Sequence, residues 1–300
     1  MPPTIAGASL DHVAVAVERW TDAWPRYAVG LGGEWNSGGM NIGFAPAQLR
    51  FANGGRVEIL QPWQPEDNPF LRRFLDHHGP SPHHLTFKVP DIAAAIDQAR
   101  VAGFSPVGVD LSNDEWKEAF LHPRQATGIV VQLAQAAYAW ESHPPEGFPT
   151  ARRDPPASLL RVTHAVDELE TGLALFEVLL GGRRVGHGLA PDATWQFVDL
   201  EWPGPPALRL ISPVGAGRRD AGLTPAPLAT WIGGLSGRVH HLAFALARAT
   251  DDEPSDDQLR SASGAVAGLL PSDGPARVIE PDDNLGTRLV LVTPDGGVSA

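Results

Sequence analysis

The chain has 300 residues, of which 43% are hydrophobic, and it contains no cysteine. A chain of this length more often forms two domains than one, and without thiols any metal must be held by nitrogen and oxygen atoms. Its formal net charge of −12 excludes the basic surface that duplex nucleic acid requires. No apolar run approaches the length of a membrane span, and the first residues lack the pattern of a signal peptide, so we expect a cytoplasmic protein that binds neither nucleic acid nor membrane.

Two stretches of the sequence show the alternation that is typical of a half-buried strand, and each carries a histidine near its start. The first places His12 on a face of small side chains, opposite three valines. The second places His84 on one face with Thr86 and Lys88, opposite three apolar side chains, and a helix is expected directly after it at residues 91–102. This repetition predicts that the chain is built from similar units.

A unit of one strand, one helix and three further strands recurs four times along the chain. The opening strands are expected at residues 10–17, 83–89, 159–166 and 239–246, and the first two units continue with helices at 20–31 and 91–102 and strands at 40–44, 48–51, 56–62, 106–110, 116–121 and 129–135. A short helix is expected at 68–77, between the first two units, and an acidic insertion follows the fourth opening strand at 251–257.

The boundary between the two unit pairs is marked by composition. Five prolines and no apolar period in residues 137–157 predict a linker. We therefore expect a metal-binding two-unit domain at 1–137, a linker at 138–157 and a degenerate two-unit domain without metal at 158–300.

Such a unit has a strongly curved sheet with a helix on one side only, so two units must pair to complete a core, and the pair forms a half-open cup. Two imidazoles, one carboxylate and one amide are expected to point into the first cup, from His12, Glu58, His84 and Gln132. These donors fit a divalent ion, and Co²⁺, Ni²⁺, Zn²⁺, Mn²⁺ and Fe²⁺ all remain open. One anionic ligand leaves the site at about +1, which suits a substrate that chelates the ion through oxygen atoms.

Each of these residues also has a purely structural interpretation. A lone histidine on a strand is commonly a hydrogen-bonded core residue, and a glutamate between apolar residues commonly faces water. The coincidence of four positions favours the metal site. By contrast, three other histidines follow no such pattern and are interpreted as residues of the connector between the units, namely His77, His78 and His83.

The second unit pair repeats the pattern without the same donors. Setting Gly181 on Gly32 gives an offset of 149 residues, under which His12 corresponds to Arg161, although a three-residue gap would place His164 there, which is the better local match. The remaining counterparts of the first-cup donors are expected to be Arg209, His241 and Val290. Arg209 would repel a cation and could clamp a carboxylate or phosphate, but we favour a structural role in which Arg161 and Arg209 pair with carboxylates such as Asp199 or Glu201.

The residues that carry these patterns resemble the vicinal oxygen chelate superfamily, which includes glyoxalases, bleomycin resistance proteins and extradiol dioxygenases. The similarity rests on the alternation of residues 10–17, on the segment 83–92, and on the segment 120–123 followed nine residues later by Gln132. Residues 8–136 are most similar to methylmalonyl-CoA epimerase, with lactoylglutathione lyase as a relative. The resemblance implies an α+β fold in which four βαβββ modules pair into two domains with curved mixed sheets, and metal ligands at the four positions named above.

Two departures from the family pattern bear on function. The family usually has a glutamate where this chain has Gln132, and the epimerase often has a glutamine where this chain has Glu58, so the two exchange places across a pseudo-twofold axis and the ligand set is kept. The epimerase resemblance also implies a catalytic glutamate at the position of Asn41, and an amide cannot act as a general base. Strict methylmalonyl-CoA epimerase activity is therefore not expected.

Our leading hypothesis is a metal-dependent lyase or isomerase, glyoxalase- or epimerase-like, that removes a proton next to a metal-chelated carbonyl. Glu58 is the candidate base, and Lys88, Thr86 and Asn41 are the candidate substrate-binding residues. The substrate would be a small molecule with chelating oxygens, such as a CoA ester, a glutathione adduct or a secondary metabolite, and the protein could form a homodimer. Two alternatives stay open: an extradiol-type ring-cleaving dioxygenase, and a non-catalytic small-molecule binding protein of the bleomycin-resistance type.

Overall fold

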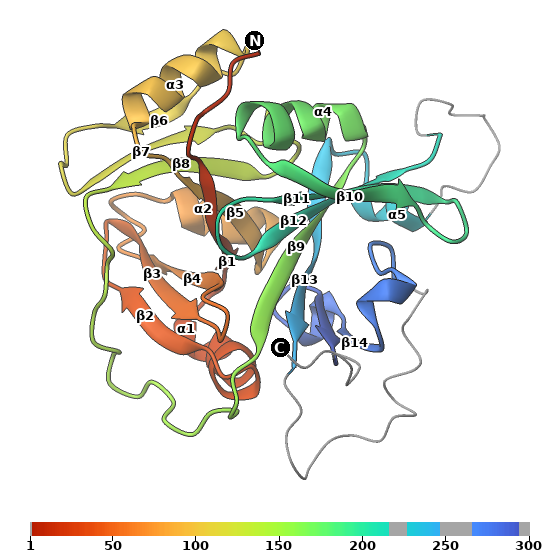
Figure 1. The fold of residues 1–300 in the computed structure, drawn as a ribbon. Coiled ribbons are helices and arrows are strands. Elements are labelled where there is room, and N and C mark those ends of the chain that lie inside the picture. Colours follow the sequence, from red (N-terminus) through yellow and green to blue (C-terminus); the bar gives the residue numbers. More distant parts are fainter. Residues whose placement is uncertain (1, 216–226, 247–265, 294–300) are drawn as a thin grey trace.

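The structure, a computed structural model, describes residues 2–215, 227–246 and 266–293 (Figure 1). The predicted acidic insertion at 251–257 lies outside these residues. Two curved mixed sheets, with few helices, make up the molecule, as the predicted α+β class requires. No helix in the described part of the chain is both long and apolar enough to cross a membrane.

The first sheet has eight strands in the order β2-β3-β4-β1-β5-β8-β7-β6. The strands are β1 (Ser9–Ala16), β2 (Glu34–Gly38), β3 (Gly43–Arg50), β4 (Arg56–Trp63), β5 (Ser81–Lys88), β6 (Val107–Asp110), β7 (Trp116–Leu121) and β8 (Val130–Ala136). At its centre β1 runs antiparallel to β5, while β4 is parallel to β1 and β8 is parallel to β5. The two predicted units therefore join through their opening strands.

One expected pair of strands is wrong in detail. The sequence predicts separate strands at 40–44 and 48–51, but β3 is continuous from Gly43 to Arg50 and the unit's second strand, β2, lies earlier. Burial alternates along the whole of β3, through Pro46, because every second side chain faces the core.

Helices cover the two faces of the first sheet unequally. On the convex face lie α1 (Trp20–Ala23), which continues as a wider π-helical turn over Trp24–Gly30, and α3 (Ile92–Val101). The Asp91 carboxylate caps α3 by accepting a hydrogen bond from the backbone amide of Ala94, at the predicted start of this helix. On the concave face α2 (Phe70–His78) buries Leu71 and Leu75.

The second sheet repeats this order with seven described strands, β10-β11-β12-β9-β13-β15-β14. Its elements are β9 (Ser158–Val166), α4 (Leu169–Leu173) with a π-helical turn over Ala174–Leu179, β10 (Arg183–Leu189), β11 (Trp195–Glu201), β12 (Ala207–Pro213), α5 (Pro227–Ile232), β13 (Gly237–Ala245), β14 (Ala276–Ile279) and β15 (Leu289–Val292), with 3₁₀ turns at Pro271–Asp273 and Pro281–Asp283. The segment between the sheets, residues 137–157, contains neither helix nor strand. The duplication of modules is confirmed.

Strand register shows which residues correspond in the two sheets. In the first sheet Thr86 lies opposite His12, and in the second the equivalent partner in β13 lies opposite Arg161. Arg161 therefore takes the place of His12, and the alignment that preferred His164 is wrong. His164 has the opposite parity on β9, so its ring faces the helix side, 6.1 Å from the ring of Phe176.

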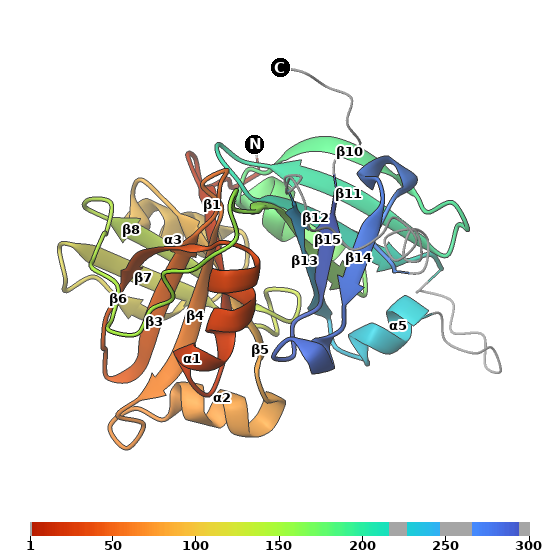
Figure 2. The ribbon, with the colours of Figure 1, turned by 90° about the horizontal axis from the view of Figure 1, so that it is seen from below.

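The two halves share one continuous hydrophobic core. The ring of Phe87 in the first half lies 5.1 Å from that of Trp202 in the second, and the rings of Phe51 and Phe244 are 4.9 Å apart. Figure 2 shows the two sheets side by side, with β5 of the first facing the second. The halves thus complete each other's apolar packing, as the two modules within each half do.

Candidate metal centre

Three of the predicted metal ligands converge on the concave face of the first sheet. They come from the adjacent strands β4, β1 and β5, and all of their candidate ligand atoms lie within 4.8 Å of one another. The Nε2 atoms of His12 and His84 lie 3.6 and 3.5 Å from one carboxylate oxygen of Glu58. Ala14 pairs with both Glu58 and His84, and its small side chain leaves the space between them open.

The position of His12 is fixed by a neighbouring carboxylate. A register shift between Leu10 and His12 places Asp11 on the same side, where its carboxylate lies 2.7 Å from Nδ1 of His12 and 2.7 Å from the guanidinium of Arg56. With Nδ1–H donating to Asp11, Nε2 is directed towards Glu58, which is how metal-binding imidazoles are commonly oriented.

The charges around His12 shift two pKa values. Burial alone would lower the pKa of His12. The charge of Glu58 and the hydrogen bonds to Asp11 and Glu58 outweigh burial and raise this pKa to about 9. Burial likewise opposes the shift of Asp11, yet the hydrogen bond and charge of His12, together with Arg56, hold the pKa of the Asp11 carboxyl well below its usual range. The protonated imidazole therefore occupies a place where a cation is favoured.

His84 supplies the strongest sign of a missing partner. Its Nε2 atom is buried without a hydrogen-bond partner, although it faces the Glu58 carboxylate. Burial, followed by the charges of His83 and His12, lowers the pKa of His84 well below its usual value, so the ring is neutral. A neutral, buried and unpartnered imidazole nitrogen beside a carboxylate and a second imidazole fits a divalent metal ion.

Gln132 is linked to this cluster through the hydroxyl group of one residue, Thr86. Thr86 Oγ1 donates a hydrogen bond of 2.6 Å to Gln132 Oε1 and lies 2.9 Å from Nε2 of His12. The Gln132 amide in turn donates to Glu118 at 2.7 Å, and the Trp116 indole donates to the same oxygen at 2.8 Å. Glu118 was not predicted, although the alternation of β7 places it on the same face as Gln132.

The other predicted substrate-binding residues lie at different distances from the cluster. Lys88 extends from the concave face of β5, with its Nζ 3.6 Å from the centre of the Trp116 ring. Burial, opposed by the charge of Asp11, lowers the pKa of Lys88 to about 8. Asn41 is exposed in the turn between β2 and β3. This turn precedes Gly43, the first residue of β3, and Gly43 is five residues before the residue of β3 that lies opposite Glu58. The structure does not bring Asn41 to the cluster.

One end of the concave face is closed by α2. Leu71 and Leu75 of this helix pack on Ala14, Ala16 and Leu60. The histidines of the cluster are nearly inaccessible, with 2% of His12 and 6% of His84 exposed, whereas Lys88 and Trp116 at the other end are only half-buried. A ligand must therefore approach the cluster from the end of the concave face where Lys88 lies.

The interpretation of His83 as a connector residue is wrong. His83 belongs to β5, and its Nδ1 atom lies 2.9 Å from Nδ1 of His84. Its ring also contacts the ring of Phe74 in α2, at 4.6 Å. His83 therefore supports the side of His84 that faces away from Glu58. His77 and His78 are exposed at the end of α2.

A segment that follows β8 bridges the two sides of the curved sheet. The amide of Ala137 donates to the carbonyl of Glu115, before β7, and the amide of Ser142 donates to the carbonyl of Asn36 in β2. Figure 1 shows this segment descending beside the first sheet from β8 to β2. We call residues 137–142 the strap. The rings of Tyr138 and Trp140 on it are stacked, 5.3 Å apart.

The corresponding place in the second sheet holds an ion-pair network. Arg209, in the position of Glu58, forms two hydrogen bonds of 2.6 and 2.9 Å to Asp199, which confirms that predicted pair. Asp273 bridges Arg209 and Arg161 at 2.9 and 2.6 Å. Glu201 pairs with Arg183 instead. Two guanidinium groups and two carboxylates thus occupy this cup.

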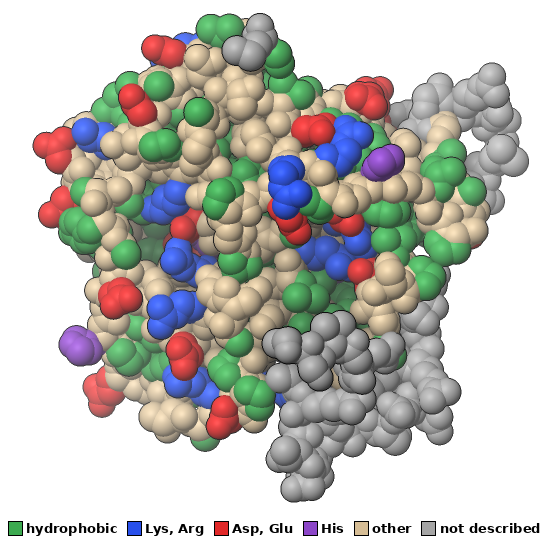
Figure 3. Space-filling model, viewed as in Figure 1, with side chains coloured by type: hydrophobic (Ala, Val, Ile, Leu, Met, Phe, Trp, Pro, Cys, Tyr) green, Lys and Arg blue, Asp and Glu red, His purple; other side chains and the backbone are tan. Residues whose placement is uncertain are grey.

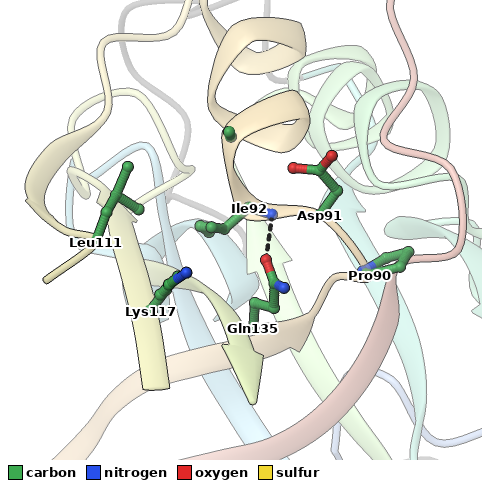
Figure 4. A pocket seen from close by; sticks show the side chains of 7 residues that line it. Pro90, Asp91, Ile92, Leu111, Lys117 and Gln135 are labelled. Carbon is green, nitrogen blue, oxygen red and sulfur yellow. Dashed lines mark hydrogen bonds between the residues drawn. The ribbon is translucent and has the colours of Figure 1, made fainter. Parts of the chain in front are cut away.

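Charged side chains of both signs lie on the surface over the first sheet. Figure 3 shows lysine and arginine side chains interspersed with aspartate and glutamate side chains on the left of the view. Elsewhere, a surface pocket of about 320 Å³ lies at the start of α3 (Figure 4). Its Gln135 side chain accepts a hydrogen bond from the Ile92 amide and its Asp91 already caps the helix, so these polar groups are satisfied within the protein.

Comparison with known proteins finds one family model that matches part of the first half. Residues 11–120 match the family model of the Glyoxalase/Bleomycin resistance protein/Dioxygenase superfamily. None of the curated protein sequences matches the chain.

One solved structure has a similar fold over the whole chain. A triple mutant of 4-hydroxymandelate synthase from Streptomyces coelicolor is similar over 100% of this chain and 95% of its own, with 17% identity and a TM-score of 0.62. Methylmalonyl-CoA epimerase from Mycobacterium tuberculosis is similar over 43% of this chain and 89% of its own, with 25% identity and a TM-score of 0.39. Residues 11–120 are therefore similar to the glyoxalase/bleomycin resistance/dioxygenase superfamily, and the second sheet repeats the strand order of the first.

Proposed function

We propose that the protein is a metal-dependent lyase or isomerase that removes a proton next to the carbonyl group of a chelated small molecule. The observation that carries this proposal is the convergence of His12, Glu58 and His84, with an imidazole nitrogen of His84 buried and unpartnered. These three residues would hold the ion, and Gln132 would join them if its amide oxygen exchanged Thr86 for the metal. When bound, the ion would act as a Lewis acid that stabilises the developing oxyanion.

The protein's own groups divide the remaining work. Glu58 is the candidate base, because its carboxylate lies within 3.6 Å of both imidazoles and would therefore lie beside a chelated substrate. Asp11 fixes the ring of His12, and Glu118 holds the amide of Gln132. Glu58 could instead remain a ligand throughout, and its replacement distinguishes the two roles.

A second candidate is a dioxygenase reaction. Two imidazoles and one carboxylate are also the donor set of non-haem Fe²⁺ oxygenases, and this is the group of residues that the structure brings together. The extradiol resemblance would require the carboxylate on the last strand of the unit pair, where this chain has Gln132. We therefore rank proton abstraction first.

Metal analysis of the purified protein tests the proposal. We expect about one divalent ion per chain in the wild type and a loss of most of it in His12→Ala and His84→Ala, whereas His77→Ala, at an exposed histidine, should bind as the wild type does. A wild-type protein that takes up no ion would contradict the proposal and favour a non-catalytic binding protein.

Activity measurements separate the two reactions. Glu58→Gln should keep part of the metal but lose proton exchange with solvent, measured by NMR in D₂O with methylmalonyl-CoA and with the hemithioacetal of methylglyoxal and glutathione. Retained exchange would remove Glu58 as the base. Oxygen consumption by the Fe²⁺-loaded protein with catechols would favour the dioxygenase.

A further inference from the structure

Lys88 is a cation at the accessible end of the cluster formed by His12, Glu58 and His84. It lies two residues beyond Thr86 on the same face of β5, which is about 7 Å along the strand. The Thr86 hydroxyl is 2.9 Å from Nε2 of His12, so a small molecule chelated at the cluster would extend towards Lys88. The Trp116 ring holds the ammonium group from one side, at 3.6 Å from its centre.

No carboxylate neutralises this ammonium group. Among the described residues, the ion pairs within 4 Å include none to Lys88. The three acidic side chains that face it have other partners: Asp11 pairs with His12 and Arg56, Glu58 with His12, and Glu118 with Gln132 and Trp116. Burial of an ammonium group without a counter-ion is costly, and the lowered pKa of Lys88 reflects this cost.

The second sheet provides an internal comparison. Since His241 corresponds to His84 in the strand register, Lys88 corresponds to Ala245. The half of the chain that lacks the cluster of donors also lacks this lysine. A structural lysine would have no reason to follow the metal-binding donors, whereas a lysine that contacts their ligand would.

We propose that Lys88, positioned by Trp116, binds an anionic group of the substrate, a carboxylate or a phosphate. The substrate is then a small molecule with chelating oxygens at one end and a negative charge at the other. This inference rests on the proposed function, because the chelated end requires the metal ion.

Calorimetric titration of the Zn²⁺-loaded protein with succinate, monomethyl succinate and 3-phosphonopropionate tests the inference. Succinate and 3-phosphonopropionate can chelate with one carboxylate and present a second charge, which the monomethyl ester lacks. We expect the wild type to bind at least one of the two dianions about tenfold more tightly than the ester. The dianion that binds more tightly identifies the group.

Variants assign the preference to Lys88. The preference for the dianion should fall to about onefold in Lys88→Met and persist in Lys88→Arg. It should be unchanged in Lys117→Met, because Lys117, on β7, pairs with Asp114. A wild-type preference near onefold, or one that survives in Lys88→Met, would overturn the inference. Zinc content and circular dichroism are measured first: wild type without zinc contradicts the proposed function as well, whereas zinc without a charge preference contradicts this inference alone.

Discussion

At the scale of single residues, the proposed metal centre depends on side chains that fix the orientation of its donors. Asp11 accepts from Nδ1 of His12, and Thr86 links His12 to Gln132. The sequence predicted the donors from strand parity, but it could not predict Asp11, because the register shift beside His12 reverses the side on which Asp11 would lie. Glu118 has the correct parity and was missed because neither a repeat nor a motif marks it.

Replacing Asp11 tests this supporting role. Asp11→Asn should weaken zinc binding about 10- to 100-fold, because the amide no longer holds His12 in the tautomer that presents Nε2. Affinity is measured by competition with a zinc-binding dye. Asp22→Asn, at a half-buried carboxylate that pairs with Arg19 away from the cluster, is the control. Equal affinities of Asp11→Asn and wild type would show that His12 needs no such support.

The half-buried charge of Lys88 predicts a pH dependence of stability. Because burial lowers its pKa from 10.5 to about 8, the unfolded chain binds more protons than the folded one between these values, and folding becomes more favourable as the pH rises through this range. Lys88→Met removes the group, so the metal-free variant should be about 2 kcal/mol more stable than wild type at pH 7. Urea unfolding should show this advantage shrinking by pH 10. An advantage that is independent of pH would contradict the assignment.

At the scale of elements, the sequence predicts strands well where alternation is regular. The histidine-bearing strands β1 and β5 and the capped helix α3 lie where they were expected. The prediction that His164 corresponds to His12 was wrong because a gapped alignment can preserve local similarity while changing strand parity. Parity decides which face of the sheet a side chain occupies. The role of Asp273 depends on a turn that follows an insertion, so no periodic pattern could indicate it.

The strap depends on one serine. Ser142 Oγ accepts from the Trp35 indole at 3.2 Å and from the amide of Gly38 at 3.0 Å. Ser142→Ala should therefore release this end of residues 137–142 at a cost of about 1 kcal/mol and accelerate their amide hydrogen exchange, without affecting β1 or β5. Ser112→Ala, in an exposed turn, is the control. Unchanged exchange in the strap would show that other contacts hold it.

At the scale of the whole molecule, the two halves are packed as a pseudo-symmetric pair. Gly128 lies against Gly237 of the second half, and Gly286 lies against Pro80 of the first. A Cβ atom at either glycine would overlap the facing carbonyl oxygen, and both glycines have positive φ. Four modules can therefore complete one another within a single chain, while the predicted homodimer and the domain boundaries stay predictions.

Glycine substitutions test this packing. Gly128→Ala and Gly286→Ala should each lower the free energy of unfolding by more than about 3 kcal/mol, because they force the halves apart. Gly204→Ala is a matched control, since Gly204 also has positive φ but meets no atom within 4 Å, and it should cost about 1 kcal/mol. Equal losses in all three variants, measured by urea unfolding, would show that backbone conformation alone is responsible.

The proposed metal centre is tested most directly by an anomalous difference map from crystals of the zinc-loaded protein. We predict one peak between Nε2 of His12, Nε2 of His84 and the carboxylate of Glu58, within about 2.0–2.2 Å of each. A protein that binds zinc only elsewhere, or crystals with no peak at these three side chains, would contradict the central claim.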